Sequence, residues 1–434
     1  MEDDMNIHNS KMLGGHLRWT VILFAFGIIT FDYIDRGIVS TALPILTSEF
    51  NLNPYFQALV GDGFTYGYLI MNPVVGYFLD RFGAKKVFAY SGTGWGIVQL
   101  TAAGAFSGIY LVINRILLGI GEAVGFPGIT KITAEWMTKS EKARSGTIGD
   151  SGVNAGVVLG TLLLLALTYV VNNNLAWRLA FIISGGLTIF LILLLAYFLY
   201  DSPEKDPRIS REELNYIIKN RDDIKEQKKL PVRSWLVTRD YWGTMMGLGA
   251  QAGIFFGLLT WLPLYLFYAR HQSLNLTLGY TALVWGMGFI GEIIGGFIVD
   301  YLNRSYGPNR GMKVGFSVSS LGVTFGILAT IYATSAFEAV LILAITFFLL
   351  RWSGIQWAVS SFIVPRTYAG QWGGHIGFWE TLWGIIIPLV FGATVAVTKA
   401  YTEGMFIFVF IGIIYFLGAV VVTRYKKLKS YNVD

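Results

Sequence analysis

Long apolar stretches alternate with short polar ones along almost the whole chain. Each apolar stretch reaches the length of about 20 residues that a helix needs to cross the hydrocarbon core of a membrane. The pattern predicts twelve membrane-spanning helices in two sets of six. The first set is expected near Trp19–Ser40, Phe56–Leu79, Val87–Ala105, Tyr110–Ala134, Gly146–Val170 and Ala176–Leu199. The second set is expected near Thr244–Tyr268, Tyr280–Tyr301, Gly311–Ala333, Ala339–Val364, Gly374–Thr398 and Met405–Thr423.

A polar stretch, Asp201–Asp240, separates the two sets. It predicts a chain divided into a bundle over residues 1–200, a linker over 201–241 and a second bundle over 242–434. Ser210 and Glu213 match the S-x-x-E capping box, which predicts an amphipathic linker helix lying along the bundle. A site for a regulatory partner is the alternative reading of this helix.

The two sets also share a local pattern, which indicates an internal repeat. Gly76–Lys86 reads GYFLDRFGAKK and Gly295–Arg304 reads GGFIVDYLNR. Both place a glycine four residues before an aspartate that basic residues follow. The expected fold is an all-α membrane protein with two pseudo-symmetric six-helix bundles.

Composition supports a membrane protein, because only 14% of the residues are charged against roughly one quarter in soluble proteins. Lys and Arg crowd alternate loops, which predicts that both termini and the linker are cytoplasmic. The same bias accounts for the basic pI without nucleic acid. The acidic start MEDDMN predicts no cleavable signal peptide. The basic residues that crowd the alternate loops are Arg81, Lys85, Lys86, Lys139, Lys142, Arg144, Arg304, Arg310, Lys313, Arg424, Lys426, Lys427 and Lys429.

Charged side chains interrupt two of the predicted spans. Asp35 and Arg36 lie in the first, and Arg115 and Glu122 lie in the fourth. Ionisable groups at membrane depth are costly and face a cavity or an opposite charge, so they mark ion or substrate pathways. Adjacent residues diverge by about 100° on a helix, whereas residues seven apart share a face about 10 Å along the axis. A crossed pairing therefore follows, with Asp35 toward Arg115 and Arg36 toward Glu122.

This pairing offers a route to proton-coupled anion transport. An incoming carboxylate can replace an acid at an arginine, and the displaced, buried acid can then take a proton. The alternative is a pair of static ion pairs that hold the first and fourth helices together. No phosphate loop is visible in the predicted cytoplasmic segments, so ATP-driven pumping is not expected. No cluster of His, Asp and Glu indicates a metal enzyme, and we expect neither an enzyme nor a metal or other cofactor.

The segment GYFLDRFGAKK resembles the signature loop of the major facilitator superfamily, G-x-L-x-D-R-x-G-R-K, with Ala84 at the first of the two basic positions. Four further stretches resemble the anion:cation symporter family, which includes hexuronate, galactonate and sialic acid transporters. The resemblance spans the full length and is stronger in the first half. The four stretches that resemble the anion:cation symporter family are Tyr33–Phe50, Arg115–Met137, Asp201–Ile217 and Trp261–Leu266.

The resemblance implies roles for individual residues. Arg36 and Arg115 correspond to substrate-binding arginines, and Asp35 and Glu122 to proton-carrying acids. Further candidates for substrate contact are Tyr33, Tyr68, Asn72 and Asn154, although the family's amide-bearing position falls on Val153. The signature loop implies a cytoplasmic latch for the outward-facing state, and its residues here are Gly76, Asp80, Arg81 and Gly83.

The second half departs from the family at Glu292, Arg351 and Glu380, where relatives usually carry uncharged residues. Arg351 is expected to pair with Glu380 or Glu292. The alternatives are a substrate with an extra polar or cationic group, or a second proton site.

The function expected from these residues is secondary active transport, in which a monomer in the plasma membrane carries a small organic anion together with protons. A sugar acid or another carboxylate is the expected substrate. An uncoupled facilitator or exchanger of another organic anion is the first alternative. A membrane sensor that does not cycle is the second, and the retained latch motif argues against it.

Overall fold

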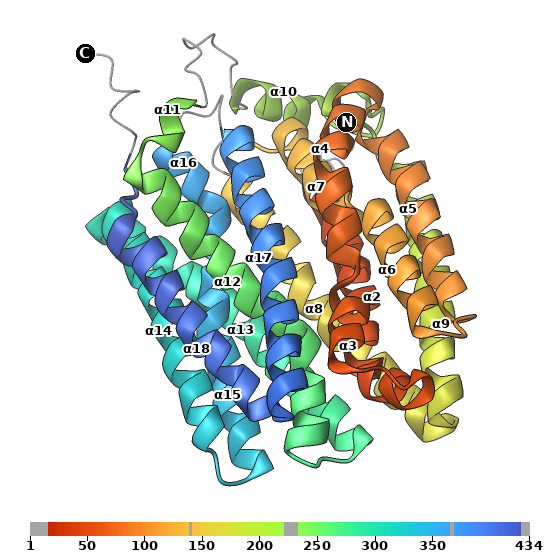
Figure 1. The fold of residues 1–434 in the computed structure, drawn as a ribbon. Helices are drawn as coiled ribbons and strands as arrows, with labels where there is room; N and C mark the ends of the chain where they lie inside the picture. The colour runs from red at the N-terminus through yellow and green to blue at the C-terminus, as the bar shows by residue number, and fades with distance from the viewer. Residues whose placement is uncertain (1–15, 139–140, 221–232, 365–368, 427–434) are drawn as a thin grey trace, which may run out of the picture.

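The chain is described by a computed structural model over residues 16–138, 141–220, 233–364 and 369–426. Within these ranges it is built from helices and contains no strand, and the helices pack in two groups (Figure 1). This confirms the predicted fold class. The first group contains α2 (Leu17–Phe50), α3 (Pro54–Asp62), α4 (Phe64–Phe82), α5 (Ala84–Ala102), α6 (Gly108–Glu122), α7 (Gly125–Trp136), α8 (Lys142–Val170) and α9 (Asn173–Phe198). The second contains α12 (Arg239–Leu264), η2 (Tyr265–Ala269), α13 (Leu274–Tyr306), α14 (Pro308–Tyr332), α15 (Ala336–Leu350), η3 (Arg351–Ala358), α16 (Val359–Ile363), α17 (Ala369–Thr398), α18 (Tyr401–Phe416) and η5 (Leu417–Val422).

Ten helices in the described part of the chain are long and apolar enough to cross a membrane. The two remaining predicted spans coincide with α3–α4 and with α5. Several predicted helix ends are wrong. The helix α2 continues well past Ser40. The hydroxyl groups of Ser40 and Thr41 donate to the carbonyls of Leu259 and Gly37, so they do not compete for the backbone groups that continue the helix. It ends where Asn51 turns left-handed, at φ +53°.

Two predicted spans are interrupted at the same place in the two halves. Helices α6 and α15 are each 15 residues long and each follow a serine N-cap, Ser107 or Ser335. After α6 the chain makes a short turn and restarts as α7, which has Pro127 near its start. After α15 it tightens into the 3-10 segment η3. The internal repeat therefore extends to the position at which a helix stops.

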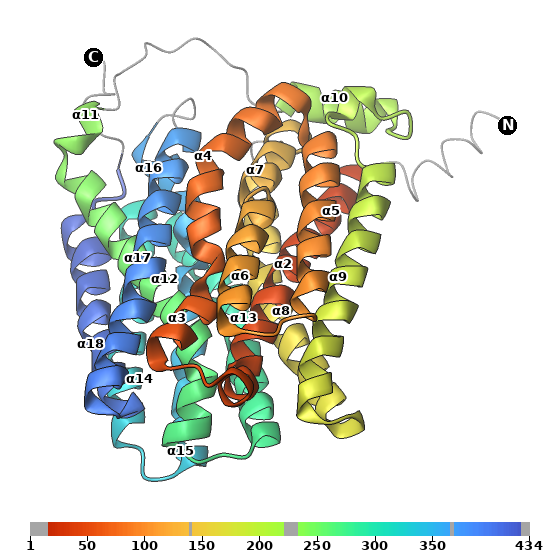
Figure 2. The ribbon, with the colours of Figure 1, turned by 45° about the vertical axis from the view of Figure 1, so that its right-hand side comes forward.

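The linker lies across one end of the bundle, which we call the linker end (Figure 2). It contains η1 (Pro203–Lys205), α10 (Arg211–Asn220) and α11 (Arg233–Leu236). Ser210 accepts a hydrogen bond from the Glu213 N–H at 3.1 Å, as the capping box predicts. The Glu213 carboxylate instead accepts from the N–H groups of Leu17 and Arg18, and so joins α10 to the start of α2. Residues 221–232 of the predicted linker, and the basic residues Lys139, Lys427 and Lys429, lie outside the described ranges.

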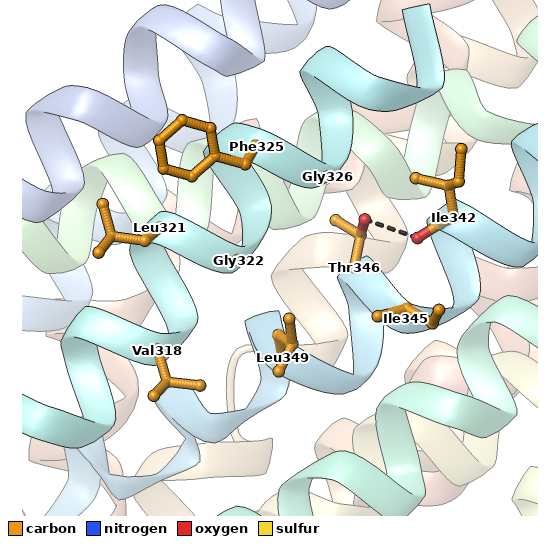
Figure 3. Close-up of a pocket in the computed structure, with 9 residues that line it drawn as sticks. All are labelled: Val318, Leu321, Gly322, Phe325, Gly326, Ile342, Ile345, Thr346 and Leu349. Carbon is orange, nitrogen blue, oxygen red and sulfur yellow. Dashed lines mark hydrogen bonds between the residues drawn. The ribbon is translucent and has the colours of Figure 1, made fainter. Parts of the chain in front are cut away.

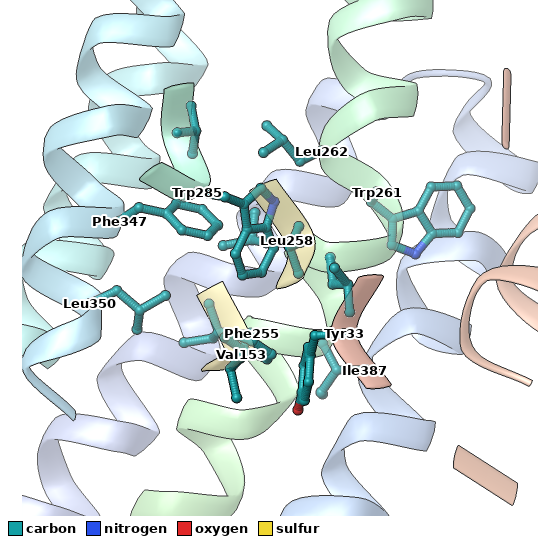
Figure 4. Packing of buried hydrophobic residues seen from close by; sticks show 14 of the residues in the cluster. Tyr33, Val153, Phe255, Leu258, Trp261, Leu262, Trp285, Phe347, Leu350 and Ile387 are labelled. Carbon is teal, nitrogen blue, oxygen red and sulfur yellow. The ribbon is translucent and has the colours of Figure 1, made fainter. Parts of the chain in front are cut away.

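The two halves are joined by side-chain hydrogen bonds toward the other end, which we call the far end. Tyr401 donates to Gln57 at 3.3 Å, and Thr168 donates to Asn275 at 3.0 Å. Between the halves, Tyr33 of α2 and Val153 of α8 pack near Phe255, Leu258 and Trp285 (Figure 4). An apolar groove between α14 and α15, lined by residues such as Leu321, Phe325 and Ile345, lies apart from this core (Figure 3).

Candidate functional site

The side chain of Arg36 lies between two acids near the middle of the first half. Its Nη2 atom is 2.8 Å from Asp32 and 3.1 Å from Glu122, and its Nε also donates to Glu122. All three side chains are buried. The predicted contact between Arg36 and Glu122 is therefore present, and Asp32 is an additional partner. We call Asp32, Arg36 and Glu122 the first cluster.

Aromatic rings enclose the guanidinium of Arg36. Its Cζ lies 4.0 Å from the ring centre of Phe64, 4.3 Å from that of Tyr33 and 5.6 Å from that of Tyr68. A cation over an aromatic face is stabilised by the ring quadrupole, most strongly where water is excluded. Tyr33 and Tyr68, which the sequence singled out, thus lie beside the arginine.

Arg115 and Asp35 are buried near this cluster without a hydrogen-bond partner in the protein. This holds for all three guanidinium nitrogens of Arg115 and for both carboxylate oxygens of Asp35. The predicted contact between them is wrong. Asp35 turns toward Ser184 on α9, whose hydroxyl donates to a carbonyl instead, whereas Arg115 lies beside Phe64. The two groups interact electrostatically without a hydrogen bond between them.

Arg351 forms a second cluster of the same kind. Its Nη2 lies 2.9 Å from Asp150 and 2.8 Å from Glu292. Asn154 donates to the same Glu292 oxygen at 2.6 Å. Of the two predicted partners of Arg351, Glu292 is in contact; Glu380 lies close enough to act on Arg351 electrostatically but is not its ion-pair partner. We call Asp150, Arg351 and Glu292 the second cluster.

Two aromatic side chains stand between the clusters. Tyr33, beside Arg36, meets Phe255 edge to face at a ring-centre distance of 6.3 Å, and Phe255 lies 5.2 Å from the Cζ of Arg351. Figure 4 shows Tyr33 and Phe255 next to each other in the core between the halves. The two arginines therefore flank one central region of the bundle.

The residues of the signature loop lie at the linker end, away from both clusters. Gly83 joins α4 to α5 at φ +82°, and Gly307 joins α13 to α14 at φ +83°. A methyl group at Gly76 would meet no other atom within 4 Å. Arg81 is exposed at the end of α4, and the side chain of Asp80 lies outside the described part. Asn72 is half-buried on α4, one turn after Tyr68.

Sequence reasoning assigned no partner to Asp32 or Asp150 and did not single out Phe64. Asp32 stands four residues before Arg36, and Phe64 four residues before Tyr68, so the i, i+4 spacing on one helix face could have found both. No local signal identifies Asp150, because its partner Arg351 lies 201 residues away.

Both clusters are built from arginine and carboxylate side chains. No group of three or more His, Asp or Glu side chains in the described ranges could hold a metal ion. What the clusters do offer is buried arginine N–H donors for an anion and buried carboxyls that can exchange a proton.

Comparisons with known proteins agree with the fold. The model of the Major Facilitator Superfamily matches residues 25–388. The chain is 30% identical over 378 residues to a probable sulfoacetate transporter, SauU, of Cupriavidus necator, covering 85% of each chain. It is 28% identical over 430 residues to a probable galactarate/D-glucarate transporter, GarP, of Escherichia coli, covering 93% of each chain. Among solved structures, that of a D-xylose-proton symporter aligns with a TM-score of 0.72 at 19% identity, over 94% of this chain and 99% of the other.

Proposed function

The chain belongs to the Major Facilitator Superfamily, and from this membership we propose that it is a symporter that carries a small organic anion together with protons by alternating access. It is a multi-pass membrane transporter and not an enzyme.

Arg115 is the observation that carries the anion site. A buried guanidinium with no hydrogen-bond partner is costly in a protein interior, and all three of its nitrogens are in that position. A carboxylate of the substrate would satisfy two of them at once, since guanidinium and carboxylate fit in a bidentate pair. Arg115 is thus the first anchor, and the aromatic walls of Tyr33 and Tyr68 with the amide of Asn72 would contact the rest of the substrate.

Arg36 would link anion binding to protons. It holds Glu122 and Asp32 through neighbouring nitrogens. A second oxygen of the anion that approached Arg36 would compete with Glu122 for these donors. The released carboxyl would be buried without its counter-charge, and burial favours the protonated form. Asp35, which has no hydrogen-bond partner, would take part in the same transfer.

Alternating access is supported by the way the halves meet. The hydrogen bonds of Gln57 with Tyr401 and of Thr168 with Asn275 join the halves toward the far end. The distribution of basic residues favours a cytoplasmic linker end. This conformation would then be closed toward the outside, and the loop containing Gly76, Asp80, Arg81 and Gly83 would act as the latch of the opposite state.

The names of the relatives favour an organic acid as substrate. One is described as a galactarate/D-glucarate transporter and another as a sulfoacetate transporter. Both substrates are small acids with two anionic groups. We propose a sugar acid or a comparable small carboxylate as the substrate, carried by a monomer in the plasma membrane with both termini in the cytoplasm.

A counterflow screen in proteoliposomes tests the proposal. Vesicles loaded with unlabelled D-galactarate, D-glucarate, D-galactonate, D-glucuronate or sulfoacetate would be assayed for uptake of the labelled acid. We expect exchange of at least one of them, and at least a 100-fold loss in Arg115→Ala, with a folded protein. Arg239→Ala is the matched control, because the Arg239 side chain is half exposed, with a relative accessibility of 54%. Normal exchange by Arg115→Ala would remove Arg115 from the site.

Coupling is tested in the same vesicles. An inside-alkaline pH gradient should drive accumulation of the exchanged acid in the wild type. If the wild type exchanges the acid in counterflow but the pH gradient drives no accumulation, the uncoupled exchanger is favoured instead.

A further inference from the structure

The second cluster joins the two halves of the molecule. Asp150 and Asn154 belong to α8 in the first half, whereas Glu292 belongs to α13 and Arg351 to η3 in the second. The contacts from Arg351 to Asp150 and from Asn154 to Glu292 both cross this interface. Any change of charge in the cluster therefore acts directly on the contact that alternating access must loosen or turn.

The cluster contains more acid than base. Asp150, Glu292 and Arg351 have relative accessibilities of 5%, 2% and 4%. With both carboxyls ionised, one guanidinium leaves one negative charge uncompensated away from water, which is unfavourable. Both carboxyls also approach the same nitrogen, Nη2, so two like charges would lie side by side. Such a pair is stabilised when one proton is shared between its members.

The hydrogen bonds show where a proton fits. Glu292 Oε2 accepts from both Arg351 and Asn154, as an ionised oxygen would. Glu292 Oε1 is buried and has no hydrogen-bond partner. It also faces Gly354, where a Cβ would lie only 2.7 Å away. Close packing thus leaves little room for a bulkier cation beside this oxygen.

The neighbouring elements add no further positive charge to the described surroundings of the pair. Glu380 on α17 acts on Asp150 and Arg351 electrostatically, Tyr33 on α2 acts on both as well, and Tyr415 on α18 lies near Arg351. A third acid and two phenols do not supply the missing cation. Arg36 interacts with Tyr33, but its single guanidinium already contacts two acids of its own, Asp32 and Glu122.

We propose that Asp150 and Glu292 share one proton and form a second proton-binding site at the interface between the halves. The site is separate from Asp35 and Glu122, and its role in transport rests on the proposed function. With the proton in place the cluster is neutral and holds α8 against α13. Without it, the excess negative charge weakens that contact and favours separation of the two halves.

Infrared spectroscopy of the full-length protein in lipid tests this site without any substrate. Protonated carboxylic acids have a carbonyl stretch at a higher frequency than amides or ionised carboxylates, so pH-difference spectra report them directly. We expect a band at neutral pH in the wild type that is lost in Asp150→Asn and in Glu292→Gln alike, since either change lets Arg351 balance the remaining acid. The double variant should lose no more than either single variant. Glu338→Gln is the control, because Glu338 is a solvent-exposed acid elsewhere.

Three outcomes decide the proposal. A protonated-carboxyl region of the spectrum that is the same in both single variants as in the wild type would overturn the site, because bands from other buried acids cancel in this comparison. Two separate bands, one removed by each variant, would overturn the sharing of a single proton. Loss of the common band in each variant would support it. The pH-gradient assay with D-galactarate is scored separately: absent pH-driven uptake in a wild type that keeps the band would count against the proposed coupling and not against this site.

Discussion

The first and second clusters contain the same three groups in different settings. In each, one arginine nitrogen approaches two buried carboxyls at 2.8–3.1 Å. The first cluster lies wholly within the first half, and an unpartnered Arg115 and Asp35 stand beside it. The second crosses between the halves and is completed by an amide, Asn154. Beside the first cluster, all three guanidinium nitrogens of Arg115 are without a partner, whereas Arg351 leaves only its Nε in that position. The contacts of the second cluster instead join the two halves.

The backbone of the two halves is far more alike than their side chains. Helices α6 and α15 have equal length and equivalent caps, and an arginine cluster lies where each stops: Glu122 ends α6, and Arg351 follows α15 directly. The repeat therefore supplies two equivalent breaks, each near the middle of a predicted span. An acid stands at one break and a base at the other, and we propose that the first takes part in ligand exchange and the second in the contact between the halves.

Removing each arginine tests this division most severely. Arg36→Met and Arg351→Met should each destabilise the protein by about 3–5 kcal/mol, because each leaves two buried acids without a counter-charge. Thermal unfolding of the purified protein in detergent measures the loss. Neutralising the acids as well should restore stability in both cases, with Asp32→Asn and Glu122→Gln in the first cluster and Asp150→Asn and Glu292→Gln in the second.

The restored variants should differ in transport. The restored second-cluster variant should still exchange substrate, since Arg115 and Arg36 are intact. The restored first-cluster variant should fold but fail in counterflow. Exchange by the latter, at a rate near that of the wild type, would show that Arg36 only supports the structure.

The acids of the two clusters should also differ in their effect on coupling. Glu122→Gln mimics a permanently protonated Glu122, so exchange should persist while accumulation driven by a pH gradient falls to the background. Glu292→Gln should reduce accumulation and leave part of it, because the first-half acids still carry a proton. Counterflow and gradient-driven uptake in the same vesicles measure both. Accumulation that survives in Glu122→Gln would leave Asp35, or a different coupling ion, as the carrier.

Local patterns predicted the fold and half of the site. Apolar length and alternating basic loops identify the spans, and the charges inside them marked Arg36, Arg115 and Glu122. The contact between Arg36 and Glu122 followed from helix geometry. The contact of Asp150 with Arg351 was not predicted, because the two residues are distant in sequence and belong to different halves. Asp35 was assigned the wrong neighbour, because sequence spacing gives its angle from Arg36 but not which helix lies on that side.

The loops at the linker end give a third contrast between the halves. Gly83 and Gly307 share nearly the same backbone angles, φ +82° and ψ 157° against φ +83° and ψ 154°, a region almost confined to glycine. At Gly83 a Cβ would also lie 2.5 Å from the carboxylate of Asp201, which accepts a hydrogen bond from the Lys85 N–H at the start of α5. At Gly307 a Cβ would meet no atom within 4 Å.

Alanine at each glycine separates backbone strain from crowding. Gly307→Ala should cost about 1–3 kcal/mol through strain alone, and Gly83→Ala should cost more because Asp201 must also move. Gly76→Ala is the helical control and should be close to neutral. Thermal unfolding ranks the three. An equal loss of stability in Gly83→Ala and Gly307→Ala would mean that the Asp201 side chain moves aside without a free-energy penalty and does not stabilise this loop.

A third arginine, Arg18, also lies between two acids, but at the linker end. It contacts Glu141 at 2.9 Å and Glu213 at 2.8 Å through different nitrogens. Here each acid has its own donor, so the arrangement needs no shared proton. Burial opposes ionisation of Glu141, but hydrogen bonds from Arg18 and Thr138 outweigh it and lower the pKa of this carboxyl.

This cluster should give the smallest effect and a defined pH dependence. Because the pKa of Glu141 is lower in the folded protein than its unfolded value of about 4.3, the stabilisation is complete above that pH and is lost as the pH falls through the folded value. We expect a loss of at most about 1 kcal/mol, the range for ion pairs near water. Hydrogen exchange at the Leu17 and Arg18 amides, compared between pH 7 and pH 4 after correction for intrinsic rates, measures it. Glu141→Gln should exchange faster at pH 7 and show a smaller further change at pH 4. An unchanged pH dependence in this variant would assign the effect to Glu213.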